Sequence, residues 1–340
     1  MVADPHRVNI RLSMSASLNL RIEGGYTNFT AYGKDNIIGG LTVAIPLKRS
    51  DVIHAHAAGH FVSDNEALLG VVLVSHDKSN FRTLRGIPNS LMENHNSEVY
   101  FYQTLLSSGM WARNLGHRNW ITPPSDGMYW VSARPEAASQ TMTITLKERH
   151  GSAMRVLFRV FLQRPHIAVS ASGAFELSTA KPIGMVCQNG FSEARILRTG
   201  TMLSFVKLIR NTGHAYTALT SSYRRLGPRI RLRFRDPITD KGNMYQTRFS
   251  NWVIRRSGVY IVSIRGDPDG ATGYLGLLLY VNGNIIFRAT SERGVPSGQD
   301  AVFKFRERDK LSVVSNDGDF QTLSFVDVAT MFSIAFVALA

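Results

Sequence analysis

An alternating run of arginines is the arrangement in this chain best suited to binding anions. Its members, called here the arginine row, are Arg229, Arg231, Arg233 and Arg235. Successive side chains of a β-strand point to opposite faces, so the run predicts four guanidinium groups on one face, with Ile230, Leu232 and Phe234 pointing to a core. Guanidinium groups bind phosphate, sulfate and carboxylate in bidentate fashion. A solvated strand face, or salt bridges between subunits, would give the same pattern.

Two pairs of residues could ligate a metal. His54 and His56 stand two apart, which places both imidazoles on one face of a strand, as a metal site would need. Asp317 and Asp319 belong to an oxygen-rich Asn-Asp-Gly-Asp segment that could supply calcium ligands. The alternatives are a polar strand end for the histidines and ordinary turn chemistry for the aspartates.

Patterns typical of catalysis are absent from the sequence. It has no Gly-x-Ser-x-Gly elbow, no phosphate-binding loop, no His-Glu-x-x-His and no dinucleotide fingerprint. The single cysteine, Cys187, excludes an internal disulfide, and its apolar surroundings predict a buried, inert thiol. The sequence therefore predicts a protein that is not an enzyme and has no cofactor other than calcium.

Charge points to anionic partners. Lys and Arg outnumber Asp and Glu by 39 to 25, which gives a net charge of +14. Nucleic acid, acidic glycan, a membrane surface and an acidic protein all remain open as partners. No secretory signal pattern and no membrane-spanning apolar run is visible, and we expect an extracellular or virion location.

The periodicity of the chain is that of β-structure. Short runs rich in Val, Ile, Phe, Tyr and Thr recur between turn residues, as in 141–146, 156–161 and 259–264. The run 277–281 leads into Asn282-Gly283, a strong hairpin signal, because both residues tolerate positive φ. The sequence therefore predicts an all-β protein.

The chain also contains an internal repeat. Residues 119–134 and 251–265 share Asn, Trp, Ser, Gly, Tyr, Val, Ser and Arg in the same order. Further on, residues 175–186 match 303–314, so one repeat is about 130 residues long. Residues 45–53 match the same part of the repeat more weakly and suggest the back half of an earlier copy.

The last repeat, residues 209–340, resembles the globular head of complement C1q and its relatives in the C1q/TNF superfamily. The segments that carry the resemblance are 232–245, 249–263, 279–283, 303–311 and 332–339. They correspond to recurrent patterns such as G-[VL]-Y-x-[FV]-S and the closing F-S-x-x-[FL] strand. Gln246 and Arg248 stand where the family usually has Asp and Gly.

This resemblance implies tandem antiparallel jelly-roll β-sandwiches that assemble as a trimer or pseudo-trimer. We expect a partial jelly roll, back half only, at 1–75, a divergent one at 76–208 and a third at 209–340. The incomplete first unit implies a partner chain that supplies its front strands. Some C1q-like heads bind calcium in the loop that matches Asp317 and Asp319.

Two functions fit these expectations. The first is a non-enzymatic recognition and assembly protein that forms homo- or hetero-oligomers and binds protein or polyanionic ligands. The second is a viral structural protein, a capsid, vertex or spike subunit, built on the same fold.

Overall fold

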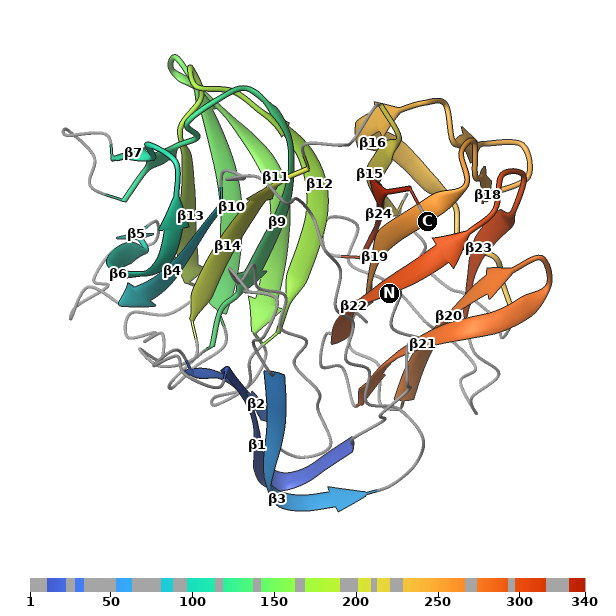
Figure 1. Cartoon of the computed structure of the whole chain (residues 1–340), viewed down its shortest axis with the longest axis horizontal. Coiled ribbons are helices and arrows are strands. Elements are labelled where there is room, and N and C mark those ends of the chain that lie inside the picture. The colour runs from blue at the N-terminus through green and yellow to red at the C-terminus, as the bar shows by residue number, and fades with distance from the viewer. Residues whose placement is uncertain are drawn as a thin grey trace.

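The computed structural model of the chain is built from β-strands. It describes residues 11–22, 28–33, 53–62, 81–87, 97–113, 119–136, 142–162, 169–189, 201–208, 213–220, 229–266, 274–292, 297–315 and 330–339. Figure 1 shows two large sandwiches side by side and a small sheet beneath them. Every described element is a strand, and all pairings are antiparallel, as predicted. No helix in the described ranges is long and apolar enough to cross a membrane.

The middle jelly roll consists of two facing sheets. One has the order β12 (Ala171–Leu177), β9 (Gly127–Arg134), β14 (Met202–Lys207), β4 (Phe81–Ile87) and β6 (Tyr100–Ser108). The other has the order β11 (Ala153–Leu162), β10 (Met142–His150), β13 (Ile183–Asn189), β8 (Ile121–Thr122) and β7 (Ala112–Arg113), and β5 (Ser97–Glu98) also pairs with β13.

The carboxy-terminal jelly roll repeats this order strand by strand. Its first sheet, read from the same edge, is β22 (Ser297–Phe305), β19 (Gly258–Gly266), β24 (Met331–Ala338), β15 (Ala215–Thr220) and β16 (Phe234–Lys241). Its second is β21 (Asn284–Glu292), β20 (Tyr274–Val281), β23 (Lys310–Ser315), β18 (Asn251–Val253) and β17 (Tyr245–Gln246). We call the first sheet of each jelly roll its inner sheet. The order of the strands makes β12 equivalent to β22 and β9 equivalent to β19.

The shared residues of the repeat occupy equivalent positions in the two cores. Trp120 and Trp252 are both buried. The hydroxyl of Tyr129 donates to the carbonyl of Ser125 at 2.9 Å, and that of Tyr260 donates to the carbonyl of Arg256, also four residues earlier, at 2.7 Å. Both tyrosine hydroxyls donate to the carbonyl group four residues earlier in the chain. The duplication therefore extends from the sequence to these hydrogen bonds.

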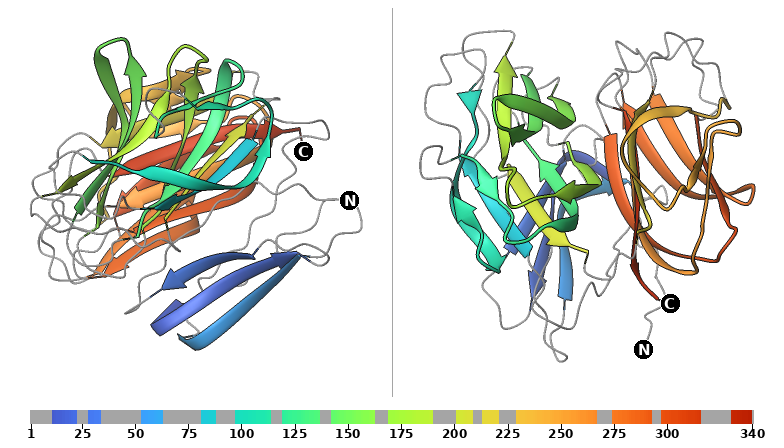
Figure 2. Two further views of the ribbon diagram at one scale, coloured as in Figure 1. Left: turned by 90° about the vertical axis from the view of Figure 1, so that its left-hand side faces the viewer. Right: turned by 90° about the horizontal axis from the view of Figure 1, so that it is seen from above.

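A separate three-stranded sheet comes from the first part of the chain. Its order is β2 (Asn28–Gly33), β1 (Arg11–Ile22) and β3 (Ile53–Val62). In the left view of Figure 2 it lies apart from the strands of both sandwiches. Only the backbone of these strands is described.

Candidate functional site

The middle jelly roll meets the carboxy-terminal one through an edge strand. Strand β12, the edge of the middle inner sheet, lies on the face of the other inner sheet (Figure 1). The hydroxyl of Thr217 on β15 accepts a hydrogen bond from the Ala174 amide at 3.0 Å and donates one to the Ala174 carbonyl at 2.9 Å. An edge strand presents unpaired backbone groups, and here one threonine satisfies two of them.

A chain of hydroxyl groups crosses the same interface. Ser172 on β12 lies 2.6 Å from a carboxylate oxygen of Asp300 on β22 and 2.8 Å from the hydroxyl of Ser132 on β9. An ionised carboxylate only accepts, so Ser172 donates to Asp300. Hydrogen bonds to a charged group are the stronger kind, and this one joins the two jelly rolls.

Glycines allow the two backbones to approach closely. A Cβ on Gly298 would lie 2.2 Å from the backbone oxygen of Ser170, and the Ser170 hydroxyl donates to the Gly298 carbonyl at 3.0 Å. A Cβ on Gly173 would lie 2.9 Å from the hydroxyl of Ser333. Side chains at these positions would force the edge strand away from the sheet on which it packs.

Apolar packing and a buried arginine complete the interface. A cluster shared by the two jelly rolls contains Trp130, Ala174, Leu208, Ala215, Ile261, Ala335 and Val337, all buried. The fully buried Arg265 on β19 reaches across and donates from Nη1 to the carbonyl of Arg159 on β11. Arg134 stands at the equivalent position of the middle jelly roll and is also buried.

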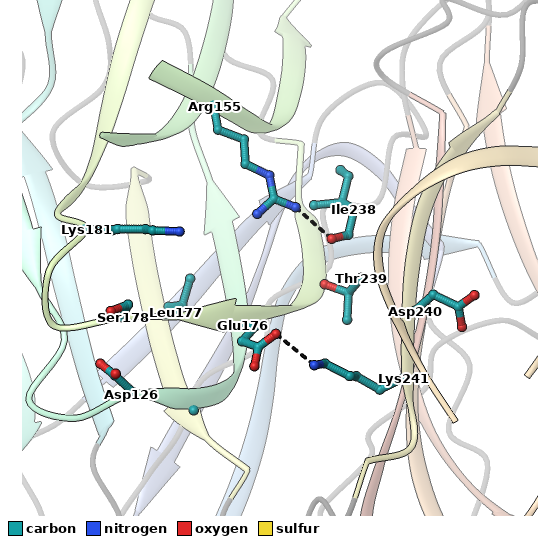
Figure 3. A pocket seen from close by; sticks show the side chains of 11 residues that line it. Asp126, Arg155, Glu176, Leu177, Ser178, Lys181, Ile238, Thr239, Asp240 and Lys241 are labelled. Atoms are coloured by element: carbon teal, nitrogen blue, oxygen red, sulfur yellow. Dashed lines mark hydrogen bonds and ion pairs between the residues drawn. The ribbon is translucent and has the colours of Figure 1, made fainter. Parts of the chain in front are cut away.

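A polar cleft of about 490 Å³ opens at one side of this interface (Figure 3). Two contacts bridge it: Lys241 Nζ lies 3.0 Å from a Glu176 oxygen, and Arg155 donates to the Ile238 carbonyl at 2.7 Å. The amide of Thr179 donates to Asp126 and lowers the pKa of that carboxyl, whereas burial raises the pKa of Asp240. Carboxylates and cations line the cleft together, so it lacks the single sign of charge that a polyanion site needs.

The arginine row lies on the carboxy-terminal jelly roll, away from this interface. Arg229, Arg231 and Arg233 are exposed, and Arg235 lies on β16 opposite Leu219, with its side chain outside the described residues. Leu232 and Phe234 are buried, as predicted.

The predicted inward position of Ile230 is wrong. The alternation of the strand does not extend back to Ile230, because Arg229 adopts a positive φ of 58°, and Ile230 is 37% exposed. The segment also passes from one sheet of the jelly roll to the other. The Leu232 amide donates to the carbonyl of Val313 on β23, whereas Phe234 begins β16, which pairs with β15 in the inner sheet. The arginine row therefore lies on a segment that crosses between the two sheets and not on a single strand.

An exposed aromatic ring lies next to the arginine row. Phe249, 54% exposed, is in the turn between β17 and β18. Arg231 Nη1 donates to its carbonyl at 2.9 Å, and the guanidinium carbon of Arg248 lies 5.5 Å from its ring centroid. Nothing in the local sequence identifies this ring, because the contact between the turn and Arg231, 18 positions earlier, is a tertiary one. The signal available was Arg248 at a position where the family usually has Gly.

The side chains of the four predicted metal ligands lie outside the part of the chain that the structure describes. Among the described residues, no three His, Cys, Asp or Glu side chains come together as a metal site would require. His54 and His56 lie on β3 opposite Arg21 and Asn19, but their side chains are outside the description. Asp317 and Asp319 lie outside the described residues altogether.

Comparison with known proteins gives matches at the level of solved structures alone. No family model and no curated protein matches the chain. Murine APRIL, of the TNF family, matches with 20% identity over 38% of this chain and 100% of that chain, with a TM-score of 0.34. The globular domain of the zebrafish complement 1qA protein matches with 15% identity over 38% of this chain and 99% of that chain, with a TM-score of 0.32.

The strand order of the two sandwiches makes the chain an all-β protein with tandem antiparallel jelly rolls, which is the fold class predicted from the sequence. The solved structures to which it is similar are C1q and TNF domains, the kind that the sequence resembles.

Proposed function

We propose that the chain is a non-enzymatic recognition and assembly protein whose jelly rolls join edge to sheet. In this proposal residues 76–208 and 209–340 each form one jelly roll, and residues 1–75 contribute part of another. The chain assembles into a homo- or hetero-oligomer with trimeric or pseudo-trimeric geometry. Its arginine row binds a polyanion.

One difference between equivalent edges carries the proposal. Ala174 on β12 is fully buried against the carboxy-terminal jelly roll. The equivalent residue on β22 is Val302, because Ala174 pairs with Trp130 of β9 and Val302 pairs with Ile261 of β19. Val302 is only half-buried and Lys304 is exposed. The first part of β22, with Gly298 and Asp300, contacts the middle jelly roll, whereas the edge from Val302 to Lys304 is accessible.

An interface between the edge of one unit and the sheet face of the next is head-to-tail. A pair of units joined in this way leaves one edge and one sheet face without a partner. Such interfaces form closed rings when the rotation between units closes, and open arrays when it does not. We propose that β22 and its neighbour β21 pack on the inner sheet of a further jelly roll, from another copy or from a partner chain. Ile285 on β21, 48% exposed, would add apolar contact there.

The mass of the purified full chain in solution tests this proposal. We expect an oligomer at micromolar concentration, and Val302→Arg should shift it to the monomer mass of 37.8 kDa by placing a charge in the contact. Met110→Arg is the matched control, because Met110 is 92% exposed and lies outside the edge. A wild-type chain that stays monomeric at all concentrations, alone and with candidate partner chains, would overturn the proposal.

A viral structural protein remains the second candidate. The accessible part of the β22 edge supports it, because a head-to-tail contact whose rotation does not close produces an extended array. Particles or sheets seen by electron microscopy of the purified chain, in place of a discrete small oligomer, would favour this function over the first.

A further inference from the structure

The surface around the turn between β17 and β18 combines positive charge with an exposed ring. It comprises Phe249, the two arginines that contact it, Arg231 and Arg248, and the exposed sequence neighbours of Arg231, which are Arg229 and Arg233, and we call it the arginine–phenylalanine patch. All five side chains are exposed. Between residues 224 and 256 the sequence has ten basic residues and two acidic ones, so the patch lies in the most strongly basic segment of the carboxy-terminal jelly roll.

The patch is held in place by contacts that leave its binding groups accessible. Arg231 donates one N–H to the Phe249 carbonyl. A guanidinium group has five N–H donors, so this hydrogen bond uses one of the five. Its backbone is fixed by a bridge to Val314 of β23, next to a hydrogen bond of 2.9 Å from the Ser315 amide to the Ile230 carbonyl. Arg231 in turn fixes the turn that carries Phe249. Arginine and ring are therefore positioned by the fold before any ligand arrives.

The chemistry of the patch discriminates among polyanions. Guanidinium groups bind phosphate and sulfate alike, so the arginines alone would accept a sulfated glycan or a nucleic acid. An exposed aromatic ring adds a surface on which a base can stack, and a sulfated glycan has no such π-face. Stacking requires an unpaired base with an open face, which favours single strands over duplexes.

We propose that the arginine–phenylalanine patch binds single-stranded nucleic acid, with one base on Phe249 and the neighbouring phosphates on Arg231, Arg233 and Arg248. This inference rests on the proposed function in one respect, the binding of a polyanion by the arginine row, and it specifies which polyanion. It is independent of the edge-to-sheet assembly.

The test uses the full chain, a fluorescein-labelled oligothymidine of about 20 nucleotides, a duplex of equal length and a heparin column. We expect Phe249→Ala to weaken oligothymidine binding about 10-fold or more, from the usual loss on removing one stacked base, while leaving retention on heparin unchanged. Phe249→Trp should retain tight binding. Changing Arg229, Arg231 and Arg233 to serine should weaken both oligothymidine binding and retention on heparin, and should flatten the log–log salt dependence of oligothymidine binding by about 2 units.

The control variant changes Arg306 and Arg308 to serine. These exposed arginines lie in the turn between β22 and β23. The Arg308 amide donates to the carbonyl of Ile254, which follows β18, whereas Phe249 precedes β18. Because the two arginines lie away from Phe249, their replacement should leave binding to oligothymidine near the wild-type level. Equal affinity of wild type and Phe249→Ala for oligothymidine would overturn the inference. Retention on heparin together with equal affinity for the single strand and the duplex would also overturn the inference, but it would leave the proposed polyanion binding intact. Binding to neither would overturn both.

Discussion

The side-chain hydroxyl of Thr217 in the carboxy-terminal jelly roll hydrogen-bonds to both backbone polar groups of Ala174 in the middle one. It accepts from the Ala174 amide at 3.0 Å and donates to the Ala174 carbonyl at 2.9 Å, and both residues are fully buried. Thr83 occupies the equivalent position of the middle inner sheet, since Thr83 pairs with Ser204 as Thr217 pairs with Ser333. It shares a hydrogen bond with the Ser204 hydroxyl at 3.1 Å instead.

Replacing Thr217 by valine should destabilise the interface between the two jelly rolls. Valine keeps the shape of threonine but leaves a buried N–H and a buried C=O of Ala174 without partners, each of which costs about 1–3 kcal/mol. We expect the free energy of unfolding to fall by about 2–4 kcal/mol, measured by urea denaturation.

Two variants provide the comparison for Thr217. Thr217→Ser keeps the hydroxyl and should retain most of the stability. Thr247→Val changes an exposed threonine in the turn before Phe249 and should change the stability by less than about 0.5 kcal/mol. If valine at position 217 left the unfolding transition unchanged, the threonine would not be what secures β12.

The β-class and the repeat were predictable because both rest on local patterns. Alternating side chains, turn residues and the shared Trp, Gly and Tyr identify strands without knowledge of what they contact. Cys187 follows the same logic: it lies in a short apolar run, and the structure buries it and raises its pKa to about 12. Local periodicity is a reliable guide where burial depends on one strand alone.

The interface and the exposed ring were not predictable from such patterns. Ser172 and Asp300 lie 128 residues apart, and nothing in either segment shows that the two side chains meet. Arg229 breaks the alternation of the arginine row through its positive φ, which a non-glycine residue rarely adopts. Both features come from tertiary packing, which overrides the local preference of a segment.

Gly298→Ala should loosen the contact between the jelly rolls. Its methyl group would lie 2.2 Å from the backbone oxygen of Ser170, so one backbone must move. We expect a destabilisation of about 1–3 kcal/mol together with faster hydrogen exchange of the Ala174 amide, which bonds to Thr217 across this interface.

Gly283→Ala is the matched control for Gly298. It has no neighbouring atom within 4 Å but a φ of +88°, so alanine there costs about 1–2 kcal/mol through backbone strain alone. The Ala174 amide should then exchange as slowly as in the wild type. Equal exchange of this amide in both variants would show that close approach at Gly298 does not maintain the interface.

Protonation of His214 should weaken the fold at mildly acidic pH. Burial, together with the nearby Arg256 guanidinium, lowers the pKa of His214 below its ordinary value of 6.5. The unfolded chain therefore binds more protons at this residue than the folded one. Its contribution to stability is complete above pH 6.5 and is lost as the pH falls through the folded-state pKa.

The prediction for His214 is tested by thermal unfolding between pH 7.5 and pH 5. The midpoint of the wild type should fall over this interval by more than that of His214→Gln, which cannot take up the proton. His150→Gln, a change at an exposed end of β10, should reproduce the wild-type curve. Because the ring of His214 also lies edge-on to Phe336, with centroids 6.3 Å apart, the variant will lose some stability at every pH. The effect of protonation is therefore measured by how steeply the unfolding midpoint changes with pH, and not by the midpoint itself. Parallel curves for wild type and His214→Gln would contradict the prediction.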